Sequence, residues 1–112
     1  MDITQTPHVT NRKDWRNWLE KNYRTKKDIW LVYYKKATGK PRIEYNDAVE
    51  EAWCFGWIDS IAKRLDDVRT AQRFSPRKPK SSYSQANIER LRYLVAKKKV
   101  MKEVVDSLGD IL

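Results

Sequence analysis

Apolar side chains recur at helical spacing in two stretches of the first half of the chain. Asn11 is a suitable N-cap for a helix that places Trp15, Trp18 and Leu19 at i, i+3 and i+4, with Arg12, Lys13 and Arg16 outside this apolar face. A second helix is predicted to begin near Asn46 or Asp47 and to end at Gly56, which suits a left-handed C-terminal cap. It would bury Ala48, Val49, Ala52 and Trp53.

Three other stretches have the composition of β-strands. Residues 29–34 are β-branched or aromatic and too few for a typical helix, so they predict a central strand followed by a loop. Residues 57–65 and 70–75 predict two further strands joined by a short turn at Asp66 and Asp67. Strict alternation along the first of these places on one face Trp57, Asp59, Ile61, Lys63 and Leu65.

The last third of the chain returns to helical spacing. Ser84 would cap a helix whose inward stripe is Ile88, Leu91, Leu94 and Val95. Met101, Val104, Val105 and Leu108 continue this spacing, and since no Gly or Pro marks a stop, the sequence leaves open whether the helix breaks near residues 97–99. We therefore predict one α+β domain over residues 1–112. Its small sheet of about three strands is covered by helices, in the order helix, strand, helix, strand, strand, helix, helix.

Composition excludes several classes of site. The single cysteine, Cys54, rules out an intrachain disulfide and a multi-cysteine zinc site, and it lies in an apolar run where a thiol acts as a small hydrophobe. His8 has no evident partner for a catalytic triad or a metal. We expect no metal, no cofactor and no catalytic residues. No apolar stretch approaches the ~20 residues of a membrane helix, and no signal peptide is recognised, so we expect a cytoplasmic protein without membrane insertion.

The net charge of +9 is unevenly distributed. Residues 12–42 hold 11 Lys/Arg against 3 Asp/Glu, and residues 77–102 hold 9 against 1. Between them, residues 43–76 hold 4 against 7. Two basic blocks flanking an acidic middle attract polyanions whatever the true ligand is, so nucleic acid is a possible partner.

Residues 73–87 form the segment most suited to holding an anion. Pro76 and Pro79 stiffen the backbone on either side of Arg77 and Lys78, and a helix capped by Ser84 would direct its free N–H groups toward the same place. The alternative is that the serines are ordinary turn and cap residues and the cations are solvated. The predicted ligand-binding residues are Arg73, Arg77, Lys78, Ser81, Ser84 and Asn87.

Asp59 is predicted to support this site together with Trp57 and Lys63. Asp59 and Lys63 lie roughly 13 Å apart along a strand, so they need other partners such as Arg73 or a ligand. The sequence does not fix the hairpin register and so does not decide whether Arg73 faces Asp59. We expect a structural role for Asp59 rather than that of a catalytic base, so that Asp59→Asn lowers the melting temperature.

The chain resembles the YdeI/OmpD-associated family, also described as bacteriocin-protection proteins. The resemblance covers nearly the whole chain and rests on Trp15-x-x-Trp18-Leu19, Ile29-Trp30-Leu31, Tyr45-x-x-Ala48-Val49-Glu50-Glu51-Ala52, Cys54-Phe55-Gly56-Trp57-Ile58-Asp59-Ser60, Arg73-Phe74-Ser75-Pro76-Arg77-Lys78 and Ser81-x-Tyr83-Ser84-x-x-Asn87. It implies a small cytosolic α+β protein and supplies no catalytic residues. The chain departs from the family in having lysines at 97–99, where relatives often have glycine. It also lacks the basic helical module that commonly follows, which suggests a minimal version or a fragment.

The function predicted from these observations is non-catalytic binding of a small anion or a phosphate-containing ligand. The alternative is nucleic-acid binding through the two basic blocks, with Tyr34 or Tyr83 stacking on bases. A third reading is an enzyme with Asp59 as base and Lys63 or Arg77 stabilising an anion. The sequence does not identify the ligand, the oligomeric state or whether the chain is complete.

Overall fold

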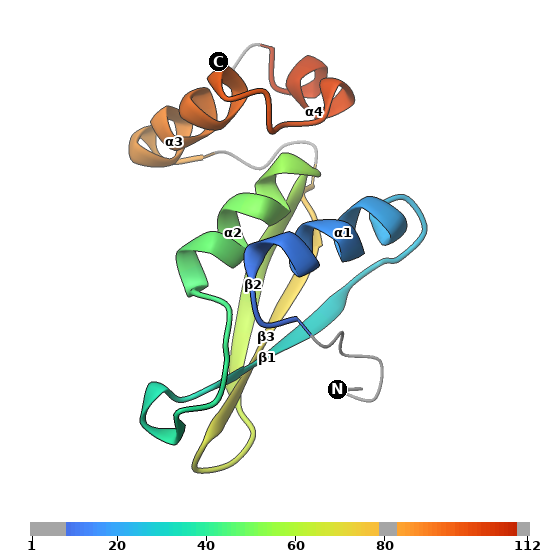
Figure 1. Ribbon diagram of the computed structural model, residues 1–112. Coiled ribbons are helices and arrows are strands. Elements are labelled where there is room, and N and C mark those ends of the chain that lie inside the picture. Colours follow the sequence, from blue (N-terminus) through green and yellow to red (C-terminus); the bar gives the residue numbers. More distant parts are fainter. Residues whose placement is uncertain (1–8, 79–82, 110–112) are drawn as a thin grey trace.

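The computed structural model describes residues 9–78 and 83–109. It confirms the predicted α+β class and element order (Figure 1). The elements are α1 (Arg12–Asn22), β1 (Ile29–Tyr34), the short 3₁₀ helix η1 (Lys36–Thr38), α2 (Tyr45–Cys54), β2 (Trp57–Arg64), β3 (Arg69–Pro76), α3 (Gln85–Ala96) and α4 (Lys102–Ser107). No helix within the described residues is both long enough and apolar enough to span a bilayer.

The three strands form an antiparallel sheet in the order β1-β3-β2. The prediction of residues 29–34 as a central strand is therefore wrong, because β1 lies at an edge and β3 occupies the centre. The uninterrupted apolar run suggested burial on both faces, but only alternate side chains of β1 are buried, namely Ile29, Leu31 and Tyr33. Its other side chains are half-buried on the opposite face of the sheet.

A β-bulge in β2 overturns the predicted alternation along that strand. Asp59 pairs with Phe74, but the register shifts before Ala62, which pairs with Gln72. The extra residue reverses the faces that follow, because side chains alternate along a strand and a one-residue slip exchanges the two faces. Asp59 thus shares a face with buried Phe74, whereas Lys63 lies on the other face, with its Nζ 5.8 Å from the centre of the Trp30 ring.

Helices α1 and α2 lie across one face of the sheet, and α3 and α4 lie together at one end (Figure 1). Trp15 of α1 is fully buried and packs against Phe74 of β3, with ring centres 5.2 Å apart. Its indole Nε1 donates a hydrogen bond of 2.9 Å to the carbonyl of Ala48 in α2. The same side chain therefore joins α1 to both α2 and the sheet.

Local signals set most of the helix ends. Asn11 and Ser84 cap α1 and α3 as predicted, each accepting a backbone N–H three residues ahead. Helix α2 begins at Tyr45, one residue before the predicted range. Gly56 follows α2 with a φ of 75°, the left-handed conformation that favours glycine.

The break that the sequence left open between the last two helices occurs at Lys98. This residue has a φ of 59° and so takes the left-handed conformation without being a glycine. The chain then turns back, and the Met101 N–H donates to the carbonyl of Cys54. Val104 and Leu108 of the following segment are buried in the core, as is the Cys54 thiol.

Glu51 is a buried carboxylate on α2 surrounded by cations. Its side chain is 1 % exposed, and it accepts hydrogen bonds from Arg12 at 2.6 Å, Arg16 at 3.1 Å and Lys99 at 2.8 Å. Arg12 and Arg16, predicted only to lie outside the apolar face of α1, thus reach inward to α2. Burial raises the pKa of Glu51, but the hydrogen bonds from Lys99, Arg12 and Arg16 outweigh it, so the pKa lies below its ordinary value.

Candidate anion-binding site

The structure spreads the predicted ligand-binding residues over several environments. Arg73 projects from β3 and forms an ion pair with Asp28, with Nε 2.9 Å from the carboxylate oxygen. Lys78 is exposed, and Ser81 lies outside the described residues. The hydroxyl of Ser84 is occupied in accepting the Asn87 N–H at 3.3 Å. Of the predicted residues, Arg77 lines one of the two hollows described below, and the others that the structure describes line neither.

Arg77 lies beside a hollow of about 220 Å³ at the end of the molecule where α4 packs. Its guanidinium lies 5.2 Å from the centre of the Tyr83 ring, and its backbone N–H donates to the Gly56 carbonyl. The hollow is lined by Gly56, Arg77, Tyr83, Val104, Ser107 and Leu108. This lining combines one cation and the hydroxyls of Tyr83 and Ser107 with apolar surface.

Of the three residues predicted to support the site, Trp57 and Asp59 share one face of β2, and Lys63 lies on the other face. Trp57 is buried and donates its indole N–H to the carbonyl of Tyr23. Lys63 faces the opposite side of the sheet from Asp59, so the two cannot act on one substrate from the same face. Asp59 instead accepts hydrogen bonds from the Tyr45 hydroxyl at 2.9 Å and from the Gln72 amide at 3.2 Å.

Asp59→Asn is expected to lower the free energy of unfolding by about 1–2 kcal/mol, because an amide accepts these two bonds less well than a carboxylate. Both partners are uncharged, so the loss stays below the ~3–5 kcal/mol of a broken buried ion pair. Urea unfolding measures the change, and Asp67→Asn in the β2–β3 turn, where the side chain is 92 % exposed, is the matched control. Unchanged stability in Asp59→Asn would contradict the structural role.

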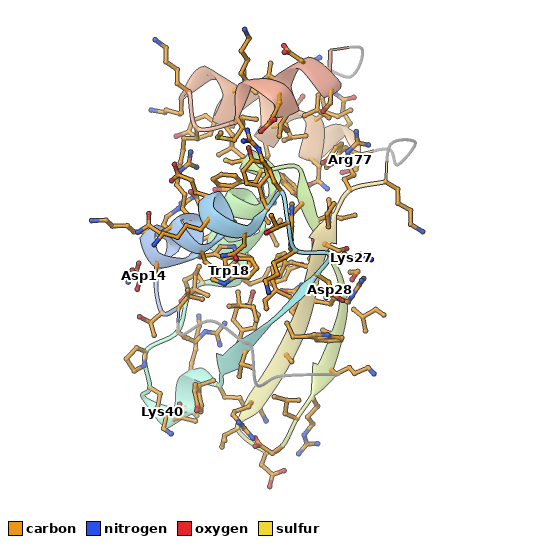
Figure 2. The ribbon with its side chains drawn as sticks, turned by 90° about the vertical axis from the view of Figure 1, so that its right-hand side faces the viewer. Asp14, Trp18, Lys27, Asp28, Lys40 and Arg77 are labelled. Atoms are coloured by element: carbon orange, nitrogen blue, oxygen red, sulfur yellow. The ribbon has the colours of Figure 1, made fainter. Side chains whose placement is uncertain are left out.

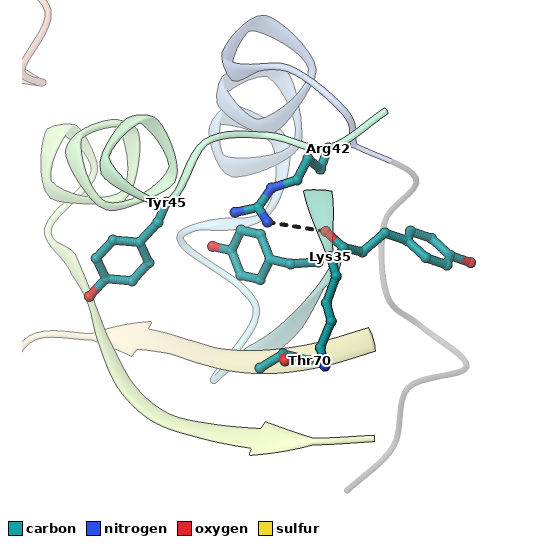
Figure 3. A pocket seen from close by; sticks show the side chains of 6 residues that line it. Lys35, Arg42, Tyr45 and Thr70 are labelled. Atoms are coloured by element: carbon teal, nitrogen blue, oxygen red, sulfur yellow. Dashed lines mark hydrogen bonds between the residues drawn. The ribbon is translucent and has the colours of Figure 1, made fainter. Parts of the chain in front are cut away.

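A second hollow, of about 170 Å³, lies at the opposite end of the sheet and was not predicted. Figure 2 shows Arg77 near one end of the molecule and Lys40, two residues before Arg42, near the other. This second hollow is lined by Tyr33, Tyr34, Lys35, Arg42, Tyr45 and Thr70 (Figure 3). We call it the Arg42 pocket. Its walls come from the end of β1, the loop before α2, the first residue of α2 and the start of β3.

Arg42 points into this pocket toward Tyr45 (Figure 3). Its Nη1 donates to the carbonyl of Tyr34 at 3.1 Å, and its guanidinium carbon lies 5.7 Å from the centre of the Tyr33 ring. The buried Nε has no hydrogen-bond partner among residues 9–78 and 83–109. An unsatisfied buried donor costs roughly 1–3 kcal/mol, more when it is charged, so an acceptor placed here would be stabilised.

A polar network under the pocket fixes its tyrosines. The Tyr33 hydroxyl donates to the Gln72 side-chain oxygen at 3.0 Å, and Gln72 in turn donates to Asp59, which also receives the Tyr45 hydroxyl. Burial raises the pKa of Tyr33, and burial followed by the hydrogen bond to Asp59 raises that of Tyr45. Both phenols are therefore uncharged at neutral pH and do not repel an anion.

The sequence does not predict the Arg42 pocket, because charge distribution identifies Arg42 only as one cation of the first basic block. A usable signal was present in the chain. Tyr33, Tyr34 and Lys35 end a strand and Tyr45 begins a helix, so the loop that joins them can bring these residues near one another. Within the described residues, no group of three His, Cys, Asp or Glu side chains is placed to hold a metal ion.

Fold and pocket together define a small α+β protein with an arginine-containing hollow at one end of an antiparallel sheet. The chain matches the family described as Domain of unknown function (DUF8412) over residues 7–107, and it belongs to this family. Neither a curated protein nor a solved structure matches the chain. The family description names no activity, and the resemblance to the YdeI/OmpD-associated proteins stays a prediction.

Proposed function

We propose that the protein is a non-catalytic binding protein that holds a small anion in the Arg42 pocket. The observation that carries this proposal is the Arg42 guanidinium, which lines the hollow and whose buried Nε has no partner in the part of the chain that the structure describes. Lys35 lines the same hollow and adds a second positive charge. An anion bound here would gain charge-assisted hydrogen bonds, which are roughly twice as strong as neutral ones.

The start of α2 supports the same assignment. Tyr45 is both the first residue of α2 and part of the pocket lining, and Glu44 at the N-cap makes no side-chain cap hydrogen bond. The helix dipole places partial positive charge at this end, which favours an anion nearby. The Glu44 carboxylate lies 3.8 Å from Lys36, which offsets its charge.

Arg42→Gln is expected to weaken binding of acetate and of inorganic phosphate at least tenfold, because it removes the charge that the pocket directs at the ligand. Titrations at low ionic strength, followed by backbone amide NMR shifts, would measure the affinity and locate it on the structure. Arg77→Gln removes the same charge at the other end of the molecule and is the matched control. Loss in Arg77→Gln with Arg42→Gln unaffected would overturn the Arg42 assignment and favour the site predicted from the sequence.

Nucleic-acid binding is the second candidate, and the exposed surface of α3 favours it. Tyr93 is 60 % exposed, with the Lys97 ammonium 5.5 Å from its ring, an arrangement in which a base can stack beside a cation. Tyr34 and Tyr83, the tyrosines predicted to stack on bases, are half-buried and lie beside Lys40 and Arg77.

If this second function is correct, affinity for a single-stranded oligonucleotide falls steeply with salt. The log–log slope is expected to be about −0.7 per phosphate contacted. Fluorescence anisotropy between 50 and 200 mM salt, about the range over which such losses are large, would measure it. Tyr93→Ala should reduce the affinity while leaving the slope unchanged, because it removes stacking and no charge. Binding that does not depend on salt would eliminate this candidate.

A further inference from the structure

We propose that the ligand of the Arg42 pocket is a carboxylic acid carrying a single aromatic ring. This inference rests on the proposed function and specifies the chemical class of the anion. It is drawn from the size of the hollow, the composition of its walls and the donors that Arg42 leaves available.

The size of the pocket limits the ligand to about one ring. Its volume is about 170 Å³. A protein cavity of about 150 Å³ accommodates benzene, whereas pockets for drug-sized ligands span about 300–1,000 Å³. A nucleotide or a two-ring compound would therefore extend far outside the walls. A bare acetate or phosphate ion would leave most of the apolar wall uncovered.

The walls are mainly aromatic. Tyr33, Tyr34 and Tyr45 line the hollow, and Thr70 adds a methyl group and a hydroxyl. The Tyr45 hydroxyl is committed to Asp59, so this exposed residue offers mainly its ring to a ligand, whereas Tyr33 is buried beneath the Arg42 guanidinium and forms the base of the hollow. Aromatic rings prefer offset or edge-to-face contact with another ring, and this preference adds to the gain from burying apolar area.

The donors of Arg42 suit a carboxylate, and the size of the hollow favours this group over a larger phosphate when a ring is also bound. Nη1 is already bonded to the Tyr34 carbonyl, and among the described residues no partner is found for Nε or Nη2, which lie on one edge of the guanidinium. Nε is buried, so Nη2 is the donor that a ligand in the hollow meets first. Two parallel N–H groups on one edge match the two oxygens of a carboxylate. Lys35 lines the same hollow, with its side chain extended toward Thr70, and adds positive charge to the pocket, while Arg42 points toward Tyr45 (Figure 3).

The test compares benzoate, acetate, inorganic phosphate and benzyl alcohol by NMR titration of the whole chain. Benzoate is expected to bind at least tenfold more tightly than acetate or phosphate, and benzyl alcohol is expected not to bind. Tyr45→Leu should weaken benzoate binding far more than acetate binding, whereas Tyr45→Phe should retain the benzoate preference because it keeps the ring. Tyr45 is 46 % exposed, so both variants are expected to fold, which thermal unfolding would verify.

The outcomes separate this inference from the proposed function. Equal affinities for benzoate and acetate, both lost in Arg42→Gln, would overturn the aromatic class and leave anion binding standing. If phosphate binds more tightly than benzoate, the assignment of the ligand as a carboxylate is overturned. If none of the four probes shifts the NMR signals of residues around Arg42, both the aromatic carboxylate and the proposed anion-binding function are overturned. If Tyr45→Leu does not fold, Lys35→Gln replaces it, and unchanged benzoate affinity in that variant would contradict the placement of the carboxylate.

Discussion

Glu51→Gln is expected to lower the free energy of unfolding by about 3 kcal/mol. Breaking a buried ion pair typically costs about 3–5 kcal/mol, because one charge is left without its partner. The lower end applies here, since Arg12, Arg16 and Lys99 each keep about a third of their side-chain surface exposed and so retain some hydration. In a domain of this size the loss corresponds to roughly 10 °C or more in melting temperature.

The same carboxylate makes stability depend on pH. The cations hold the pKa of Glu51 below its ordinary value, so the folded state binds its proton less readily than the unfolded state does. Its contribution is therefore fully present above the unfolded pKa of about 4.3 and is lost as the pH falls through the lower folded pKa. As the pH falls through this lower folded pKa, the stability of the wild-type protein should approach that of Glu51→Gln.

Urea unfolding of both proteins between neutral pH and pH 3 would test these expectations. Glu89→Gln, an equivalent change at an exposed position on α3, is the control and should alter the unfolding free energy by less than about 0.5 kcal/mol. A Glu51→Gln protein as stable as the wild type at neutral pH would show that the surrounding cations are adequately solvated without this carboxylate.

The features that the sequence predicted correctly are those with local causes. Asn11 and Ser84 cap their helices through side chains that bond a backbone N–H only three residues away. Gly56 ends α2 because a positive φ is least costly for glycine. The apolar spacing that identified Trp15 and Leu19 likewise depends on the 3.6-residue repeat of one helix, so the helices could be located without knowledge of their neighbours.

The features that the sequence did not predict depend on which elements meet in space. The central position belongs to β3 because this strand pairs with β2 on one side and β1 on the other, and hydrophobicity does not encode that order. The bulge before Ala62 reverses the face of Lys63 through one extra residue that no Gly or Pro marks. Glu51 resembled an ordinary surface residue of an acidic run, since its cations come from positions 35 to 48 residues distant.

The candidate site shows the same difference between features with local causes and features that depend on elements distant in sequence. Residues 73–87 have cations and serines that are close in sequence, which predicts an anion site, yet Arg73 pairs with Asp28, 45 residues away, and Ser84 caps a helix. The Arg42 pocket is assembled from β1, the loop before α2, α2 itself and β3, and its members are not close in sequence. The pocket exists only when these elements come together in the fold, whereas the charge of each residue can be read from the sequence.

Trp15→Ala is expected to have the largest effect on stability, a loss of about 4–5 kcal/mol. Removing a buried Trp or Phe side chain typically costs about 3–5 kcal/mol, and Trp15 is fully buried. The loss of its hydrogen bond to the Ala48 carbonyl adds about 1 kcal/mol. Since small domains are stable by only about 5–15 kcal/mol, the variant is expected to be partly unfolded at physiological temperature.

Chemical denaturation of three variants separates the causes of this loss. Trp15→Phe keeps an aromatic ring against Phe74 and loses the indole N–H, so its effect should be intermediate. Trp30→Ala removes the same residue type from the half-buried face of β1 and should cost about 1–2 kcal/mol, because less apolar area leaves water there on folding. Equal losses in Trp15→Ala and Trp30→Ala would mean that α1 contributes no more to the core than the opposite face of the sheet does. A loss in Trp15→Phe as large as in Trp15→Ala would instead place most of the energy in the single hydrogen bond that joins α1 to α2.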